Sequence, residues 1–295
     1  MAMWRLVGLM LVLFTSVAGA AVSVVDDTGA TVTLAQPAQR IVSLAPHLTE
    51  MLFAGGAGQQ IVGAVEYSDY PEAAKSIPRV GGYSGFDLER IVALSPDLVV
   101  AWRSGNSAAA VEKLKQLGLK VYLSEPRAFE DVATNLERLS ILTGHVAAGQ
   151  RAAGDYRAEL KQLQQRYAGV TKVRIFYQIW NRPLMTINGQ HLIGHVIELC
   201  GGQNVFATLP TLAPQVDLEA VLLANPEAII ASGMGYERPE WLKEWQRWPQ
   251  LAAVKSKSIY VIHPDIINRH SPRILQGALL MCEQLQEVRQ KRLRI

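Results

Sequence analysis

The chain has 295 residues, of which 49% are hydrophobic and 19% are charged, and its formal net charge at pH 7 is +3. This length suffices for two domains with hydrophobic cores of their own. The nearly balanced charge speaks against a nucleic-acid partner. The basic cluster at Arg289–Arg294 reads as the end of a solvated helix.

The first residues read as a secretory signal peptide. Arg5 provides a cationic start, Leu6–Phe14 is a short apolar run, and small residues follow up to Ala20. The run is too short to span a bilayer comfortably, and no Cys stands just behind it to carry a lipid. We therefore expect residues 1–20 to be cleaved and the mature protein to be soluble and periplasmic.

The next part of the chain alternates strands with helices. A hairpin is expected from two β-branched runs around the turn residues Asp27-Thr28-Gly29. The further strands are Arg40–Leu44, Ile61–Val65, Leu98–Trp102 and Val121–Leu123, and the helices are Thr49–Ala54, Ala108–Leu117 and Phe129–Leu142; the hairpin strands are Val22–Val25 and Thr31–Leu34. Strands separated by helices predict a parallel sheet. These elements form an N-terminal lobe at residues 21–144.

A long helix is expected between the two halves of the chain. From Ala147 to Tyr167 there is no Pro, and most residues are strong helix formers. Gly, Ser and Pro are too sparse for a flexible linker, so residues 145–168 are predicted to form a rigid connecting helix. The C-terminal lobe, residues 169–295, is expected to hold the strands Val173–Ile179, Ala228–Ala231 and Ile259–Ile262 and the helices Leu192–Leu199 and Pro272–Arg289.

Two stretches repeat one plan of short helix, Pro-containing turn and buried strand. Asp87–Ala101 and Asp217–Ala231 lie 130 positions apart, and five of their fifteen positions are identical. Such a match indicates an internal duplication, and two similar lobes imply a cleft between them. The predicted fold is α/β, with two Rossmann-like lobes on parallel sheets joined by a single long helix. Each copy also carries a carboxylate at its third position, Glu89 and Glu219.

Cys200 and Cys282 are the two cysteines of the chain. In an oxidising compartment an even pair is more often bridged than free, so we expect a disulfide, with two buried thiols as the alternative. Both cysteines fall in the C-terminal lobe. The bridge would therefore stiffen one lobe and would not tie the two lobes together.

The usual enzyme signatures are missing from the sequence. It contains no P-loop motif, and the Gly-rich stretch Ala54–Gly58 follows a helix, which is the wrong context for a dinucleotide fingerprint. Gly82–Gly85 lacks the spacing of a nucleophile elbow. We therefore expect no catalysis and no enzyme cofactor.

The histidines are the candidate metal ligands of the sequence. His191 and His195 stand four apart on a predicted helix and could face one ion. The other four are scattered, at His47, His145, His263 and His270. We interpret them as exposed histidines on helices and in loops that share no common site, so no metal site is predicted.

Four aromatic residues lie in loops, at the end of a predicted strand or directly behind one. They are Tyr67, Tyr83, Trp102 and Trp180. In open α/β sheets, ligands bind beyond the carboxyl ends of the strands, and aromatic rings there offer a flat, amphipathic surface to a large ring system. Any one of them could simply cover the core of its lobe. Together they predict a cleft for a large planar ligand.

Several short segments carry a likeness to a known family. Glu66–Pro71 reads Glu-Tyr-Ser-Asp-Tyr-Pro and Ala101–Arg103 reads Ala-Trp-Arg. With Leu88–Val99, Glu198–Gly202 and His270–Ile274, they resemble the cobalamin-binding periplasmic proteins of bacterial ABC importers. The likeness covers essentially the whole mature chain. The Leu-Glu and Pro-Asp-Leu element within Leu88–Val99 is shared by siderophore, haem and cobalamin binders. The segments Glu66–Pro71 and Ala101–Arg103 are more specific.

The resemblance implies a protein that captures cobalamin between two lobes and delivers it to an ABC importer in the inner membrane. Cobalamin would be a transported ligand and not a cofactor, and the free protein would be a monomer with limited hinge motion. The positions that line the cleft in this family match Tyr67, Tyr83, Trp102, Trp180, Asp265 and Arg269.

The chain departs from the family at two places. Tyr83 stands where the best-known members carry Trp, and Ile266 and Ile267 stand where they carry aromatic residues, so weaker stacking on the second lobe is expected. Tyr83 also matches an iron-ligating Tyr of haem-binding relatives, but Gly85 replaces the Arg that supports it there. The alternative ligands are haem and a ferric siderophore, and the siderophore is favoured by Arg103, Arg182 and Arg269. The alternative function is a ligand-sensing module that docks on a membrane receptor.

Glu89 and Glu219 are expected to dock the loaded protein on a dimeric permease. One carboxylate on each lobe would pair with arginines on the two permease subunits. The alternative is that both residues only favour the dipoles of their helices from the first turn.

Overall fold

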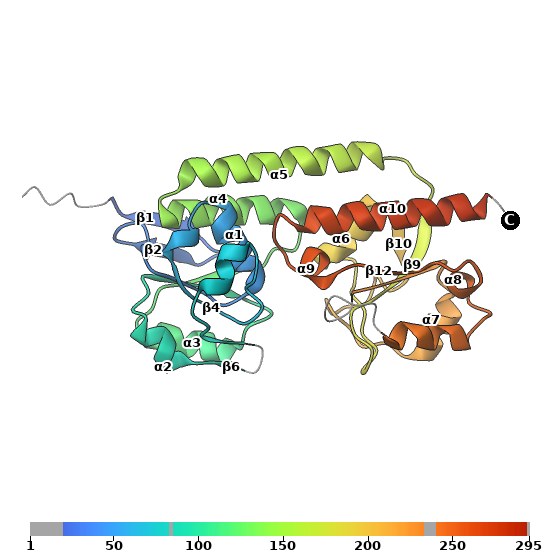
Figure 1. The fold of residues 1–295 in the computed structure, drawn as a ribbon, viewed down its shortest axis with the longest axis horizontal. Helices are drawn as coiled ribbons and strands as arrows, with labels where there is room; N and C mark the ends of the chain where they lie inside the picture. The colour runs from blue at the N-terminus through green and yellow to red at the C-terminus, as the bar shows by residue number, and fades with distance from the viewer. Residues whose placement is uncertain (1–19, 83–84, 233–239, 294–295) are drawn as a thin grey trace, which may run out of the picture.

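The computed structural model describes residues 20–82, 85–232 and 240–293. The predicted signal peptide lies outside these ranges except for Ala20, and so does the predicted ligand contact Tyr83. Within them no helix is long and apolar enough to cross a membrane. The described chain forms two α/β lobes side by side, with one long helix running past both (Figure 1).

The first lobe is built on a four-stranded parallel sheet in the order β4-β3-β7-β8. Alternate residues of a strand point to opposite faces, and in β7 Leu98 and Val100 join one hydrophobic cluster while Val99 and Ala101 join another. The sheet is therefore covered on both sides. Its elements are β1 (Val22–Val25), β2 (Thr31–Leu34), β3 (Ile41–Ser43), α1 (Pro46–Ala54), η1 (Gly58–Gln60), β4 (Ile61–Ala64), η2 (Glu72–Ser76), β5 (Gly81–Gly82), β6 (Gly85–Phe86), α2 (Leu88–Ala93), β7 (Leu98–Trp102), α3 (Ala108–Gln116), β8 (Val121–Ser124) and α4 (Phe129–Thr143).

The second lobe repeats this arrangement with the sheet order β10-β9-β11-β12, again parallel. Its inner strand β9 divides its side chains in the same way, with Ile175 and Tyr177 on one face and Phe176 on the other. The elements are β9 (Val173–Gln178), α6 (Leu192–Leu199), β10 (Gly202–Asn204), α7 (Leu218–Ala224), β11 (Ala228–Ala231), η3 (Glu240–Arg247), α8 (Ala252–Lys255), β12 (Ile259–Val261), α9 (Pro264–Ile267) and α10 (Ile274–Arg292).

The two copies of the sequence repeat occupy matching places. Each forms a helix followed by the third strand of its sheet, α2–β7 in the first lobe and α7–β11 in the second. The turns agree as well, because Ser95 and Asn225, at the same position of the repeat, both have positive φ, at 45° and 42°. The predicted common plan of the two segments and the two-lobed α/β fold are confirmed.

Helix α5 (Val146–Arg166) carries the chain from the first lobe to the second (Figure 1). Its buried positions recur at intervals of three and four residues, at Gly149, Ala153, Tyr156, Leu160 and Leu163, so one face is apolar over its whole length. The predicted long connecting helix is confirmed. The lobe boundaries at 144 and 168 stay a prediction.

Several predicted boundaries differ from the structure. Helix α1 begins at Pro46 and not at Thr49, because Pro fits the first turn of a helix, where its missing N–H is not needed. The predicted start of this helix was therefore three residues too late. The short elements β10, α8 and α9 were not predicted, since three or four residues carry too little periodicity to be read.

The predicted disulfide is confirmed. Cys200 and Cys282 are bonded and fully buried, and their Cα atoms lie 4.5 Å apart. The bond joins the end of α6 to the middle of α10, within the second lobe. It stabilises the packing of these two helices and leaves the connection between the lobes to other contacts.

Candidate functional site

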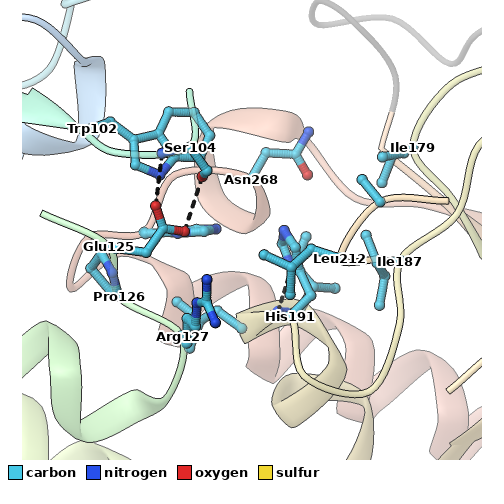
Figure 2. Close-up of a pocket in the computed structure, with 14 residues that line it drawn as sticks. Trp102, Ser104, Glu125, Pro126, Arg127, Ile179, Ile187, His191, Leu212 and Asn268 are labelled. Atoms are coloured by element: carbon cyan, nitrogen blue, oxygen red, sulfur yellow. Dashed lines mark hydrogen bonds between the residues drawn. The ribbon is translucent and has the colours of Figure 1, made fainter. Parts of the chain in front are cut away.

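A cavity of about 330 Å³ lies between the lobes. Figure 2 shows Trp102, Ser104 and Glu125 on one side of it and Ile179, Ile187 and Leu212 on the other. The first-lobe lining is Trp102, Ser104, Glu125, Pro126 and Arg127, and the second-lobe lining is Ile179, Ile187, His191, Leu192, Ile193, Leu212, Ala213, Asn268 and His270. Both sheets contribute through loops behind the carboxyl ends of their strands, as predicted for an open α/β fold.

Trp102 is held firmly at the end of β7. Its backbone N–H donates to Oδ1 of Asn106 at 2.7 Å, and Nδ2 of Asn106 donates to the Leu44 carbonyl at 2.9 Å. Gly105 gives the indole its space, because a Cβ there would lie 1.9 Å from the ring. The local sequence around the Trp therefore fixes where the ring stands.

The polar part of the first-lobe wall centres on Glu125. Its two carboxylate oxygens accept from the backbone N–H and the hydroxyl of Ser104, at 2.8 Å and 2.9 Å. Its own backbone N–H donates to Asp27 at 2.6 Å. This carboxylate is thus anchored beside an otherwise largely apolar cavity.

Three histidines and Trp102 form a chain of neighbouring rings at the boundary of the lobes. The ring of His47 packs edge-on against Trp102 at 5.2 Å, and that of His270 lies 5.6 Å from Trp102 and 5.2 Å from His191. Burial lowers the pKa of each of the three to about 3. The nearby cation Arg269 adds to the effect on His47. The cluster is therefore uncharged at neutral pH.

Two predicted site residues, Asp265 and Arg269, lie in ion pairs. Nη2 of Arg269 is 2.7 Å from Oδ1 of Asp265, and its Nη1 is 2.8 Å from both Glu50 and Asp69 of the first lobe. Burial acts to lower the pKa of Arg269, but its hydrogen bonds to Asp69 and Glu50 hold the pKa above the ordinary value. Neither Asp265 nor Arg269 lines the cavity.

The predicted aromatic contacts are spread out. Trp102 lines the cavity, whereas Tyr67 is 70% exposed and Trp180 is 40% exposed, with its Nε1 donating to the Arg182 carbonyl at 2.9 Å. It is Ile179, one residue before Trp180, that reaches the cavity. Sequence reasoning missed Glu125, Ser104, Asn268 and Leu212, which carry no local motif.

Glu89 and Glu219 stand in the first turns of α2 and α7. Both are exposed, and among the described residues neither takes part in an ion pair. The two helices lie at the end of the molecule opposite to α5, one on each lobe (Figure 1). The structure thus presents two unpaired carboxylates on one side.

Comparison with known proteins places the chain in a family. The model described as "Periplasmic binding protein" matches residues 41–266.

The chain belongs to the periplasmic binding protein family.

Two sequence relatives are close to this periplasmic binding protein over most of its length. A protein of Vibrio parahaemolyticus named vitamin B12-binding protein is 39% identical over 257 residues, which cover 87% of this chain and 93% of the relative. A protein of the same name from Photorhabdus laumondii is 38% identical over 248 residues, covering 84% and 88%.

Solved structures agree with the fold. The crystal structure of the periplasmic vitamin B12 binding protein BtuF of Vibrio cholerae matches with a TM-score of 0.79 at 36% identity, covering 86% of this chain and 98% of that one. The periplasmic heme-binding protein RhuT of Roseiflexus matches with a TM-score of 0.76 at 19% identity, covering 85% and 98%. At that identity the second likeness shows the fold alone.

Membership in this family confirms several predictions. The chain is a binding protein of the periplasm and not an enzyme, since the family and the relatives above consist of binding proteins. The two-lobed fold with its connecting helix matches the structure of BtuF with a TM-score of 0.79. The individual contact residues for a ligand and for a permease stay predictions.

Proposed function

We propose that this protein captures cobalamin between its lobes and delivers it to an ABC importer in the inner membrane. The observation that carries the proposal is the identity of 39% to a vitamin B12-binding protein over 87% of the chain. The apolar and aromatic lining of the interlobe cavity supports it, because burial of a large ring system against such a surface supplies most of the affinity. Cobalamin is then a transported ligand, the free protein is a monomer, and residues 1–20 are the cleaved signal peptide.

The cavity is smaller than the ligand. At about 330 Å³ it lies at the low end of the range for drug-sized ligands, and a corrinoid is considerably larger than those. Ligand entry therefore requires the lobes to separate or the cleft loops to move aside. The exposed rings of Tyr67 and Trp180 support a site that extends outward from Trp102, with Tyr83, Asp265 and Arg269 as its further contacts.

For delivery, we propose that Glu89 and Glu219 bind arginines on the two subunits of a dimeric permease. Exposed carboxylates without an intramolecular partner among the described residues can form bidentate contacts with a guanidinium. Their common side of the molecule supports simultaneous docking of both lobes (Figure 1).

Calorimetric titration of the mature protein with cyanocobalamin, and in parallel with hemin, tests the ligand. We expect one-to-one binding of cyanocobalamin with a dissociation constant in the nanomolar range and no binding of hemin. Trp102→Ala should raise that constant about tenfold or more. Trp248→Phe, at a partly buried residue that packs against the core of the second lobe away from the cavity, should leave it unchanged. Binding of hemin without binding of cyanocobalamin would overturn the proposal and indicate a haem carrier.

A further inference from the structure

A cluster of buried charges crosses from one lobe to the other beside the cavity. Glu50 of α1 is 4% exposed and Arg269 of the second lobe is 8% exposed. Charged side chains are rarely buried to this degree unless they are paired. The partners of Glu50 lie far away in the sequence, in the segment Arg269–Arg273 ahead of α10.

The hydrogen bonds of the Glu50 carboxylate go to the second lobe. Oε1 accepts from Nη1 of Arg269 at 2.8 Å and from Nη1 of Arg273 at 2.9 Å. Oε2 accepts from the hydroxyl of Ser271 at 2.5 Å. One carboxylate of the first lobe thus gathers three donors from a five-residue segment of the other lobe.

Further contacts hold the two arginines in place. Nη1 of Arg269 also donates to Asp69 of the first lobe at 2.8 Å, and Asp265 binds its Nη2 from within the second lobe at 2.7 Å. The guanidinium of Arg273 lies over the ring of Tyr70, 3.9 Å from its centroid. Both arginines therefore contact first-lobe residues from two different segments.

We propose that Glu50, Asp69, Arg269, Ser271 and Arg273 form an interlobe clasp that sets the spacing of the two lobes. Because three bonds converge on one carboxylate, a small displacement of either lobe breaks them together and leaves desolvated charges without partners. Helix α5 joins the lobes covalently, and the clasp joins them a second time beside the cleft.

The clasp also positions part of the cavity lining. Asn268 and His270, which line the cavity, flank Arg269 directly in the chain. Ser271 follows them and is itself bound to Glu50. Arg269 thus acts on the cleft as a positioning residue through Glu50, whatever the ligand is, so the inference does not depend on the proposed function.

Distances between the lobes in the ligand-free protein test the clasp. Spin labels at Glu112→Cys on α3 and Lys255→Cys on α8, both exposed, report one interlobe distance distribution by double electron–electron resonance. Glu50→Gln, which keeps the shape and removes the charge, should broaden the distribution and shift it to longer distances. Arg273→Gln, which removes one of the three bonds, should do the same to a smaller degree.

The matched control is Glu72→Gln, because Glu72 is an exposed carboxylate of the same lobe whose ion pair is with Lys75 nearby. Its distribution should superimpose on that of the unsubstituted protein. Circular dichroism first establishes that each variant is folded. If the distance distributions of Glu50→Gln and Arg273→Gln superimpose on that of the unsubstituted protein, the clasp is overturned. If Glu50→Gln does not fold, the distance distribution of Arg273→Gln alone decides.

Discussion

The charge state of three histidines follows from their place between the lobes, where His47 and His270 are buried and His191 is half-buried. His47, His191 and His270 have a pKa of about 3, against an ordinary value of 6.5 in the unfolded chain. Below pH 6.5 the unfolded state therefore binds more protons than the folded state, and the free energy of unfolding falls as the pH falls toward 3. Each histidine contributes a loss of about 1.4 kcal/mol per pH unit in that window.

We accordingly predict a melting temperature that drops steeply between pH 6.5 and pH 4, measured by scanning calorimetry. His47→Gln should make this dependence shallower, since one buried imidazole that resists protonation is gone. His145→Gln, outside the cluster, should keep the slope of the unsubstituted protein. An unchanged slope in His47→Gln would contradict the assignment.

At the scale of elements, the contact between α4 and α5 depends on a glycine. Gly149 of α5 stands so close to α4 that a Cβ would lie 2.2 Å from the side chain of Ser140. Gly154 of the same helix is exposed and has no atom within 4 Å of such a Cβ. A side chain at position 149 would therefore clash with α4, whereas position 154 has room for one.

Gly149→Ala is predicted to lower the free energy of unfolding by about 1–3 kcal/mol, because α4 and α5 must move apart. Gly154→Ala is predicted to raise it by about 0.5–1 kcal/mol, because Ala loses less backbone entropy than Gly in a helix. Urea unfolding of both variants measures the two changes. A stabilised Gly149→Ala would show that the helices are not in the close contact described.

At the scale of the whole molecule, the two lobes are joined more tightly than by one helix alone. A single hydrophobic cluster includes Ile41 of the first sheet, Leu160 of α5 and Ile175 of the second sheet. The interlobe clasp adds charged contacts beside the cleft. Both features agree with limited hinge motion.

Docking on a permease also belongs to the whole molecule, since it requires both lobes at once. Glu89→Ala/Glu219→Ala is predicted to abolish cobalamin uptake by cells while its calorimetric affinity for cyanocobalamin stays unchanged, because neither residue lies near the cavity. Glu112→Ala, an exposed carboxylate on α3, serves as control and should transport normally. Normal uptake by the double variant would refute docking through this pair.

Much of the fold could be predicted from the sequence because its signals are local. The alternation of strands and helices, the repeat at Asp87 and Asp217, and the uninterrupted helix-forming run of α5 are each contained in a short stretch of chain. Of the site, Trp102 was found because it directly follows a buried run. Ile179 was not, since the choice between it and Trp180 depends on how the chain turns after β9.

The sequence alone determined the two α/β lobes, their common plan, the helix between them and the cysteine pair, because periodicity, helix propensity and composition act over a few neighbouring residues. Only the tertiary structure decided the contacts across the cleft. The bond from Glu50 to Arg269 spans 219 positions, and the meeting of His47 with His270 depends on the same alignment of the lobes. Such pairs have no sequence pattern, because the distance between them is set by the packing of two whole lobes and not by the chain that connects them.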